Sequence, residues 1–328
     1  MRTFAAWLVG LTALIFCQAA QSQPKGLIYS AEEVGAREDG SGAFRTHCVE
    51  SHISSDDPLV WPGQPGATHE HVFFGNRSVD AFTTIERLKT GQSTTCDGIA
   101  LNQSGYWVPS LYDAYGERIR YVDPLFYYKT GYHVPAETIQ PPPPGLRMIA
   151  GDAMARQAQG VHVAKFRCES WQANGRWFSP GDPLDHVNHL PRCDVGDLLE
   201  IRIVFPQCWD GKNLSSRDLQ SHMAYPLPAR IPHVGTGSCP TSHPIAIPEI
   251  SYNFGIYVSK DMGPSDQWRF SSDMGAGIVG GSSVHGDWMN GWDAGIMETI
   301  VRNCLNAAQE CMVGLLGDGT RLKPIPLD

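Results

Sequence analysis

The sequence has few charged residues and none of the short motifs that mark several common enzyme classes. Asp, Glu, Lys and Arg make up 18% of the 328 residues, whereas Gly and Pro number 34 and 24. This balance favours short strands and many turns over long surface helices. There is no G-x-S-x-G, P-loop or H-E-x-x-H. The easiest hydrolase, P-loop nucleotide-binding and zincin interpretations are therefore excluded.

Positive charge and long apolar runs are also scarce. The formal net charge is −9, which argues against nucleic acid or an anionic membrane as a partner. Beyond the first 17 residues, no apolar stretch approaches the roughly 20 residues that a membrane-spanning helix needs. We expect a protein without a membrane span, without a nucleic-acid partner, and monomeric.

The N-terminus has the layout of a secretory signal peptide over residues 1–22. Arg2 supplies a positive charge, residues 4–17 are apolar, and small residues follow. Cleavage after Ala19 or after Ser22 fits this pattern. A lipoprotein acylated at Cys17 is the alternative, although Phe16 is a poor residue before such a cysteine. We expect a secreted, extracellular protein, or a periplasmic one in a Gram-negative host.

Eight of the nine cysteines lie beyond this segment, and an even number in an exported chain predicts disulfides. Spacing does not fix the connectivity among the 105 possible pairings. We favour neighbours in the sequence. There is no C-x-x-C pair, which makes a zinc–thiolate site the weaker alternative. The favoured pairs are Cys48–Cys96, Cys168–Cys193, Cys208–Cys239 and Cys304–Cys311.

Patterning predicts a mainly β protein. Residues 23–43 are expected to form a flexible segment, and residues 44–328 a single large β-sandwich or jelly-roll-like domain with long loops. One C-terminal helix is predicted over 293–308 from its apolar stripe. A tetraproline at 141–144 either links domains or precedes a strand, and the Gly-rich segment 261–283 is a candidate lid. The predicted strands are 71–74, 106–111, 125–129, 146–150, 161–167, 198–205, 222–225 and 249–257.

Histidine placement gives the main functional signal. His69 and His71 are two residues apart, so both imidazoles lie on one face of a strand. His222 and His285 lie in other distinctive segments. Imidazole nitrogens on a rigid scaffold suit zinc or copper. The alternative is that these histidines are hydrogen-bonded within loops.

A second signal combines carboxylates with tryptophans. Asp210 and Lys212 lie on a loop next to Cys208, while Asp287 and Asp293 flank Trp288 and Trp292. Such groups recognise sugars, since the ring stacks on an aromatic face and carboxylates bond hydroxyls or transfer protons. The alternative is structural: Asp210-Gly211 is a good turn and Asp293 a good helix N-cap.

These segments together resemble a known family over nearly the whole mature chain. The stretches that carry the resemblance are 57–60, 62–63, His69 with His71, 94–96, 106–112, 127–128, 144–151, 205–212, 221–226, 285–287 and 291–293. The chain resembles the DUF1996 family, secreted proteins of undefined function. The family commonly has Asp-His where this chain has Asp218-Leu219, so that histidine is unavailable here. The resemblance implies extracellular glycans only by association.

We therefore expect an exported protein with a histidine-centred site that acts on extracellular or cell-wall polysaccharide. The alternatives are a non-catalytic glycan-binding protein and an exported metal-binding protein. A divalent zinc or copper ion would be held by His69, His71, His222 and His285. The expected catalytic residues are His222, Asp210 and Asp287. The expected substrate-binding residues are Trp107, Trp209, Lys212, Tyr225 and Trp292.

Overall fold

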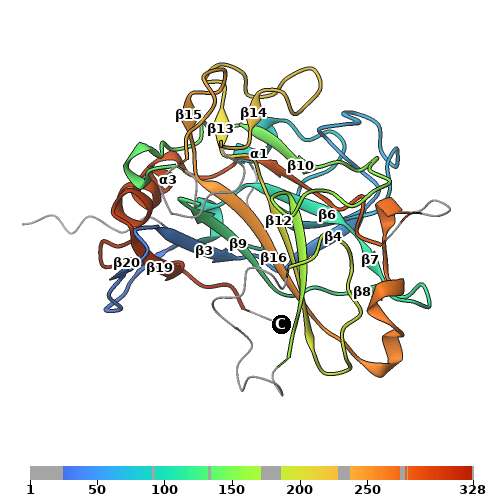
Figure 1. Ribbon diagram of the computed structural model, residues 1–328. Helices are drawn as coiled ribbons and strands as arrows, with labels where there is room; N and C mark the ends of the chain where they lie inside the picture. Colours follow the sequence, from blue (N-terminus) through green and yellow to red (C-terminus); the bar gives the residue numbers. More distant parts are fainter. Residues whose placement is uncertain are drawn as a thin grey trace, which may run out of the picture.

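Two mainly antiparallel sheets dominate the structure, a computed structural model (Figure 1). It describes residues 25–90, 93–131, 134–170, 186–227, 237–273, 278 and 280–326. The predicted signal peptide, residues 1–22, lies outside these described residues. Among the described residues, no helix is both long enough and apolar enough to cross a membrane.

The smaller of the two main sheets has five strands. Their order is β10 (Arg147–Gly151), β18 (His285–Met289), β6 (Gly105–Pro109), β5 (His71–Gly75) and β4 (Glu50–Ser54), and every neighbouring pair is antiparallel. The order mixes strands from distant parts of the chain, so the sheet brings together segments that the sequence keeps far apart.

The larger sheet has seven strands. Their order is β11 (Ala164–Glu169), β12 (Leu198–Val204), β16 (Glu249–Tyr257), β9 (Val122–Lys129), β3 (Ala43–His47), β19 (Gln309–Val313) and β2 (Gly35–Ala36). All pairs are antiparallel except β3 with β19, which is parallel. In β12, apolar and polar residues alternate, so one face of the strand turns to the core and the other does not.

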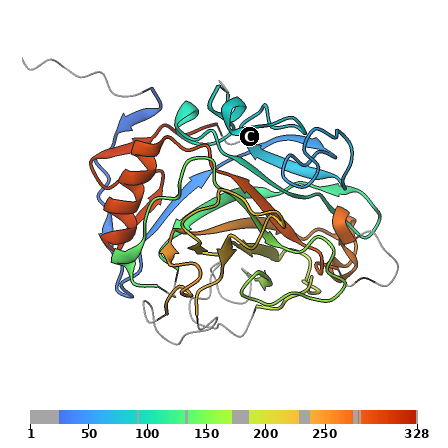
Figure 2. The ribbon, with the colours of Figure 1, turned by 90° about the horizontal axis from the view of Figure 1, so that it is seen from above.

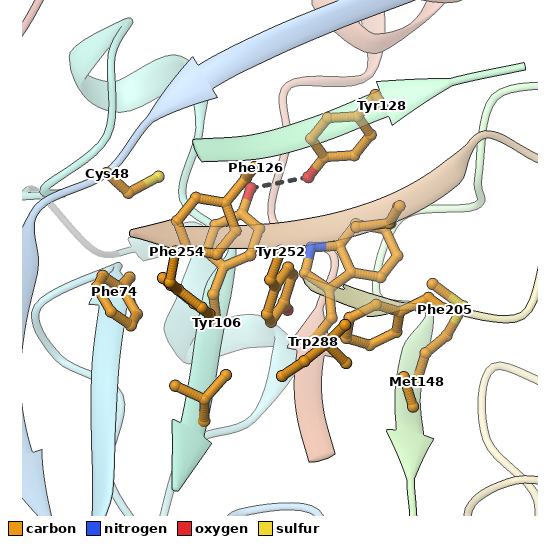
Figure 3. Packing of buried hydrophobic residues seen from close by; sticks show 14 of the residues in the cluster. Cys48, Phe74, Tyr106, Phe126, Tyr128, Met148, Phe205, Tyr252, Phe254 and Trp288 are labelled. Carbon is orange, nitrogen blue, oxygen red and sulfur yellow. Dashed lines mark hydrogen bonds between the residues drawn. The ribbon is translucent and has the colours of Figure 1, made fainter. Parts of the chain in front are cut away.

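The core fills the space between the two sheets, so the fold is a β-sandwich (Figure 3). Phe74, Tyr106 and Trp288 point inward from the five-stranded sheet, and Phe126 and Tyr252 point inward from the other. Their rings pack edge to face or tilted, an arrangement that favours aromatic contacts. The mainly β, sandwich-like class predicted from the sequence is confirmed.

Smaller elements complete the sandwich. The C-terminal helix lies at one end of it (Figure 2). It comprises α3 (Ala294–Ile300) and a π-helical turn, η6 (Val301–Asn306), and Asp293 caps its start by accepting from the Ile296 N–H. The short sheets are β1 (Leu27–Tyr29) with β20 (Thr320–Leu322), β14 (Met223–Ala224) with β13 (Cys208–Trp209) and β15 (Ile245–Ala246), and β17 (Arg269–Phe270) with β7 (Leu111–Tyr112) and β8 (Arg118–Ile119). The other helices are α1 (Ile85–Thr90), η1 (Ile99–Leu101), η2 (Ala136–Thr138), η3 (Lys260–Met262), η4 (Ser265–Gln267) and η5 (Ser271–Asp273).

All four predicted disulfides are present: Cys48–Cys96, Cys168–Cys193, Cys208–Cys239 and Cys304–Cys311. Each predicted strand overlaps an observed one, and the tetraproline precedes β10. Within the segment 23–43, which the sequence predicts to be flexible, β1 pairs with β20 and β2 pairs with β19. That segment is therefore attached to the domain at two points.

Candidate metal centre

Three histidines converge on the outer face of the five-stranded sheet. His71 is on β5 and His285 is on β18, and β6 runs between these two strands. His71 pairs with Pro109, and His285 lies two residues before Asp287, which pairs with Trp107. Both histidines are therefore level with Pro109, about 10 Å apart across two strand spacings. Their side chains lean toward each other over the short proline, and the imidazole of His69 joins them from the preceding loop.

The second nitrogen of two of these rings is fixed by the backbone. His71 Nδ1 lies 3.1 Å from the Asp56 carbonyl oxygen, and His285 Nδ1 lies 2.9 Å from the Ser283 carbonyl oxygen. A carbonyl only accepts, so each Nδ1 carries the proton and each Nε2 of the neutral ring is a bare lone pair. Such a backbone partner on the far nitrogen is the usual way that a metal-binding histidine is oriented.

The bare nitrogens face one another. His285 Nε2 lies 3.2 Å from His69 Nε2 and 3.3 Å from His71 Nε2. His69 can satisfy one contact if its Nε2 is protonated, since its Nδ1 is 3.3 Å from the Thr68 hydroxyl. The contact between His71 and His285 has no proton to share. Ligand bonds of 2.0–2.1 Å to a tetrahedral zinc ion would place the donor atoms about 3.3 Å apart, which matches these separations.

Two buried carboxylates border the three rings. Asp287 Oδ2 lies 3.7 Å from His285 Nε2, and neither Asp287 oxygen has a hydrogen-bond partner among the described residues. Asp57 uses Oδ1 to accept the N–H groups of Leu59 and Val60. Ligand atoms of Asp57, His71 and Asp287 lie within 4.8 Å of one another, as do those of the three histidines. A buried, unpartnered carboxylate is costly unless a proton or a cation neutralises it.

Burial shapes the titration of the whole group. It lowers the pKa of His69 to about 3, with a smaller effect from His285, and lowers the pKa of His285 to about 4. Burial, then the neighbouring His285 and His69, also holds the pKa of His71 well below its usual value. Burial and the nearby Asp57 raise the pKa of Asp287 well above its usual value. The site therefore keeps its imidazoles neutral, the form that binds metals.

The structure does not bring His222 into this group. His222 Nε2 is 2.7 Å from the Arg147 carbonyl oxygen, and its Nδ1 is 3.0 Å from the Ser216 hydroxyl. Arg147 is four residues along β10 from Gly151, the partner of His285, which places it about 13 Å away along the strand. The predicted fourth metal ligand is thus wrong for this arrangement, because both nitrogens of His222 serve the loop that packs on β10.

Asp210 and Lys212, predicted beside His222, belong to a turn. Asp210 Oδ1 accepts the N–H groups of Lys212 and Asn213 at 2.8 and 2.9 Å. The Lys212 side chain is exposed, and Asp210 is half-buried. The structural alternative, a loop capped by its own aspartate, accounts for these contacts. Of the three predicted catalytic residues, only Asp287 lies at the histidine centre.

The aromatic residues predicted to bind substrate do not form a common face. Trp107 is fully buried and stacks on Phe73, with ring centroids 5.5 Å apart. Trp292 is buried, and its indole N–H donates to the Tyr128 hydroxyl. The Tyr225 hydroxyl donates to the Val204 carbonyl, and Trp209 donates to the Asn213 carbonyl. Trp107 and Trp292 therefore offer no ring face to a sugar in this structure.

Sequence reasoning missed Asp57 as a member of the centre. Burial raises the pKa of Asp57, and the N–H groups of Val60 and Leu59 and the nearby Trp107 indole offset only part of this shift. The only available signal was the place of Asp57 in a motif that resembles the family. Leu219, where the resemblance led us to expect a histidine, packs against the apolar cluster that contains Trp107 and Met289, with a positive φ of 65°.

Comparison with known proteins assigns the chain to a family. A family model described as a domain of unknown function, DUF1996, matches residues 57–292. The chain belongs to the DUF1996 family. The matched DUF1996 region begins at Asp57 and includes all three histidines and Asp287. No curated protein and no solved structure matches the chain.

Proposed function

We propose that this DUF1996 protein is an exported metal-binding protein whose centre takes a divalent transition metal on His69, His71 and His285, with Asp287 as the fourth ligand. The observation that carries the proposal is the contact of 3.3 Å between His71 Nε2 and His285 Nε2. Both nitrogens are bare because their rings donate elsewhere, so only a cation between them turns a repulsive contact into a favourable one.

The unpartnered Asp287 carboxylate gives independent support. It is 1% exposed, and an ionised carboxylate so buried needs a compensating charge. A divalent cation at the meeting point of the histidines would supply it. Three neutral imidazoles and one carboxylate would then carry a net charge of about +1 with the metal, which is far cheaper to bury than a lone anion.

The donor set favours zinc or copper. Imidazole nitrogen suits both metals, whereas calcium and magnesium take oxygen ligands. Separations of 3.2 and 3.3 Å fit a compact tetrahedral arrangement, the geometry that zinc adopts most often. Four protein ligands in a buried site are typical of a metal that is held firmly, while a catalytic zinc keeps one position open.

Action on extracellular or cell-wall polysaccharide stays a prediction. It rests on the sequence, and the buried Trp107 and Trp292 lend it no support. The half-buried His69 is the most exposed of the three histidines. If His69 can leave the metal, a water or substrate oxygen can take its place, and the site then acquires the open position that catalysis requires.

Elemental analysis of the purified full chain tests the proposal. The protein is stripped with a chelator, incubated with equimolar zinc or copper, desalted and measured. We expect one metal ion per chain and a rise in thermal unfolding temperature, because a ligand that binds only the folded state stabilises it.

His285→Ala, which removes the ligand shared by both short contacts, should retain no metal under the same conditions. A chain that binds neither metal after reconstitution, or a His285→Ala variant that binds as much as the wild type, would contradict the proposal.

A further inference from the structure

The outer face of the seven-stranded sheet carries a second feature, unrelated to the histidine centre. Two adjoining cavities of about 170 and 90 Å³ lie over it and share Lys129 and Arg202 in their walls. Lys165 completes the wall of the smaller cavity. Lys165 and Arg202 pair across β11 and β12, and Lys129 is on β9. Three cations thus gather on a protein whose formal net charge is −9.

The cations of the larger cavity are already paired. Arg37 binds Asp39 and Glu310, and Arg45 binds Glu310 at 2.8 Å. In the smaller cavity Lys129 binds Glu249 at 3.2 Å, and Arg202 binds Glu200. The Lys165 ammonium has no ion pair and no hydrogen bond within the described ranges, and the residue is half-buried. Its ammonium is therefore a charge without a counterion of its own.

The surroundings of Lys165 make this arrangement costly without a ligand. Burial, followed by repulsion from Arg202 and Lys129, lowers the pKa of Lys165 to about 8, and the attraction of Glu249 and Glu200 offsets only part of this shift. Gln207, fully buried, lines the same cavity and uses its amide N–H to donate to the Thr130 carbonyl at 2.7 Å. Its amide oxygen has no donor among the described residues. The smaller cavity is therefore lined by a cation without an ion pair and by a buried amide with an unpartnered oxygen, and the Glu249 carboxylate that pairs with Lys129 lines it as well.

We propose that this cavity binds the carboxylate of a hydroxylated acid, such as a sugar acid, between Lys165 and Arg202, with a hydroxyl group of the ligand donating to Gln207 Oε1. A carboxylate accepts charge-assisted bonds from both cations, which are stronger than neutral ones. The larger cavity then accommodates the rest of the ligand beside Tyr127. That ring is flanked by Arg45 at 5.0 Å and Lys129 at 5.6 Å from its centroid.

Calorimetric titration of the full chain with glucuronate, glucose and acetate tests the assignment. We expect saturable one-to-one binding of glucuronate, no binding of the uncharged glucose, and binding of acetate about tenfold weaker because it lacks hydroxyls for Gln207. Prior removal of metals with a chelator should leave the affinity unchanged, which separates this site from the histidine centre. Absence of saturable glucuronate binding, or equal binding of glucose, would overturn the proposal.

Matched variants locate the site. Lys165→Met keeps the aliphatic stem and should weaken glucuronate binding by about tenfold or more, whereas Lys165→Arg should restore it. Lys260→Met removes an exposed lysine elsewhere and should bind as the wild type does. If Lys165→Met does not fold by circular dichroism, Gln207→Glu provides the test, because a second carboxylate should repel the ligand. Wild-type affinity in the folded Lys165→Met or Gln207→Glu variant would place the ligand elsewhere and overturn the assignment.

Discussion

The histidine centre and the loop around His222 look alike in the sequence, since each joins histidine to nearby aspartate. The structure separates them by what satisfies their polar atoms. Both nitrogens of His222 have partners within the protein, and Asp210 closes its own turn. At the other site, His71 and His285 turn bare nitrogens toward each other, and Asp287 has no partner among the described residues. Polar groups whose hydrogen bonds are all made within the protein have a structural role. Several neighbouring polar groups without hydrogen-bond partners indicate a ligand that binds between them.

The largest expected difference between the two regions is in metal retention. His71→Ala should weaken metal binding by more than about 100-fold, because loss of even an outer-shell partner costs 10–100-fold and His71 is a direct ligand. His222→Ala should bind as the wild type does. Competition against a chromophoric chelator measures both affinities. Equal losses of metal affinity in His71→Ala and His222→Ala would contradict the difference between the two regions.

Removing the disulfide next to the His222 loop should lower the stability of the protein and leave its metal affinity unchanged. Cys208 and Cys239 close a loop with a sequence separation of 31, so replacing both with serine should cost about 3–4 kcal/mol of unfolding free energy. Denaturant unfolding measures this loss. Metal affinity should stay at the wild-type value, since the histidines are on β5, β18 and the loop before β5. A fall in affinity beyond a few-fold would show that the two regions are coupled.

The metal-free protein should lose stability in acid. The folded-state pKa values of His69 and His285, about 3 and about 4, lie below the unfolded value near 6.5, so only the unfolded chain takes up protons between them. Stability is therefore complete above pH 6.5 and falls as the pH drops, by about 2 kcal/mol per histidine at pH 5. Denaturant unfolding of chelator-treated protein from pH 7 to pH 5 tests this. His69→Gln, which cannot titrate, should show a shallower slope, and an unchanged slope would contradict the account.

The smallest effect concerns the buried carboxylate. Asp287→Asn replaces a carboxyl group whose ionisation burial opposes, so the metal-free variant should be more stable than the wild type by an amount of order 1 kcal/mol at pH 7. The same variant should bind metal more weakly. Asp210→Asn, at the exposed turn, is the matched control and should change neither quantity appreciably. A destabilised metal-free Asp287→Asn protein would show that the carboxylate has a structural partner.

The sequence predicted local features well and long-range ones incompletely. The two-residue spacing of His69 and His71 predicted that their imidazoles lie together, although His69 lies in the loop before β5 and not on the strand. The Asp293 cap and the disulfide pairs followed from local chemistry and proximity along the chain. The strand order β18-β6-β5 could not be predicted from the sequence. This order brings His285 next to His69 and His71 and leaves His222 apart. Buried and exposed tryptophans look the same in the sequence. The sequence therefore predicts substrate binding for Trp107 and Trp292, which the structure buries among apolar side chains.

X-ray absorption spectroscopy of the reconstituted protein tests the central claim most directly. The account predicts a four-coordinate zinc with three imidazole nitrogens at about 2.0–2.1 Å and one carboxylate oxygen. In His69→Ala the spectrum should show two imidazole ligands instead of three. A zinc ion surrounded only by oxygen ligands, or one with fewer than three imidazoles in the wild type, would contradict the histidine centre.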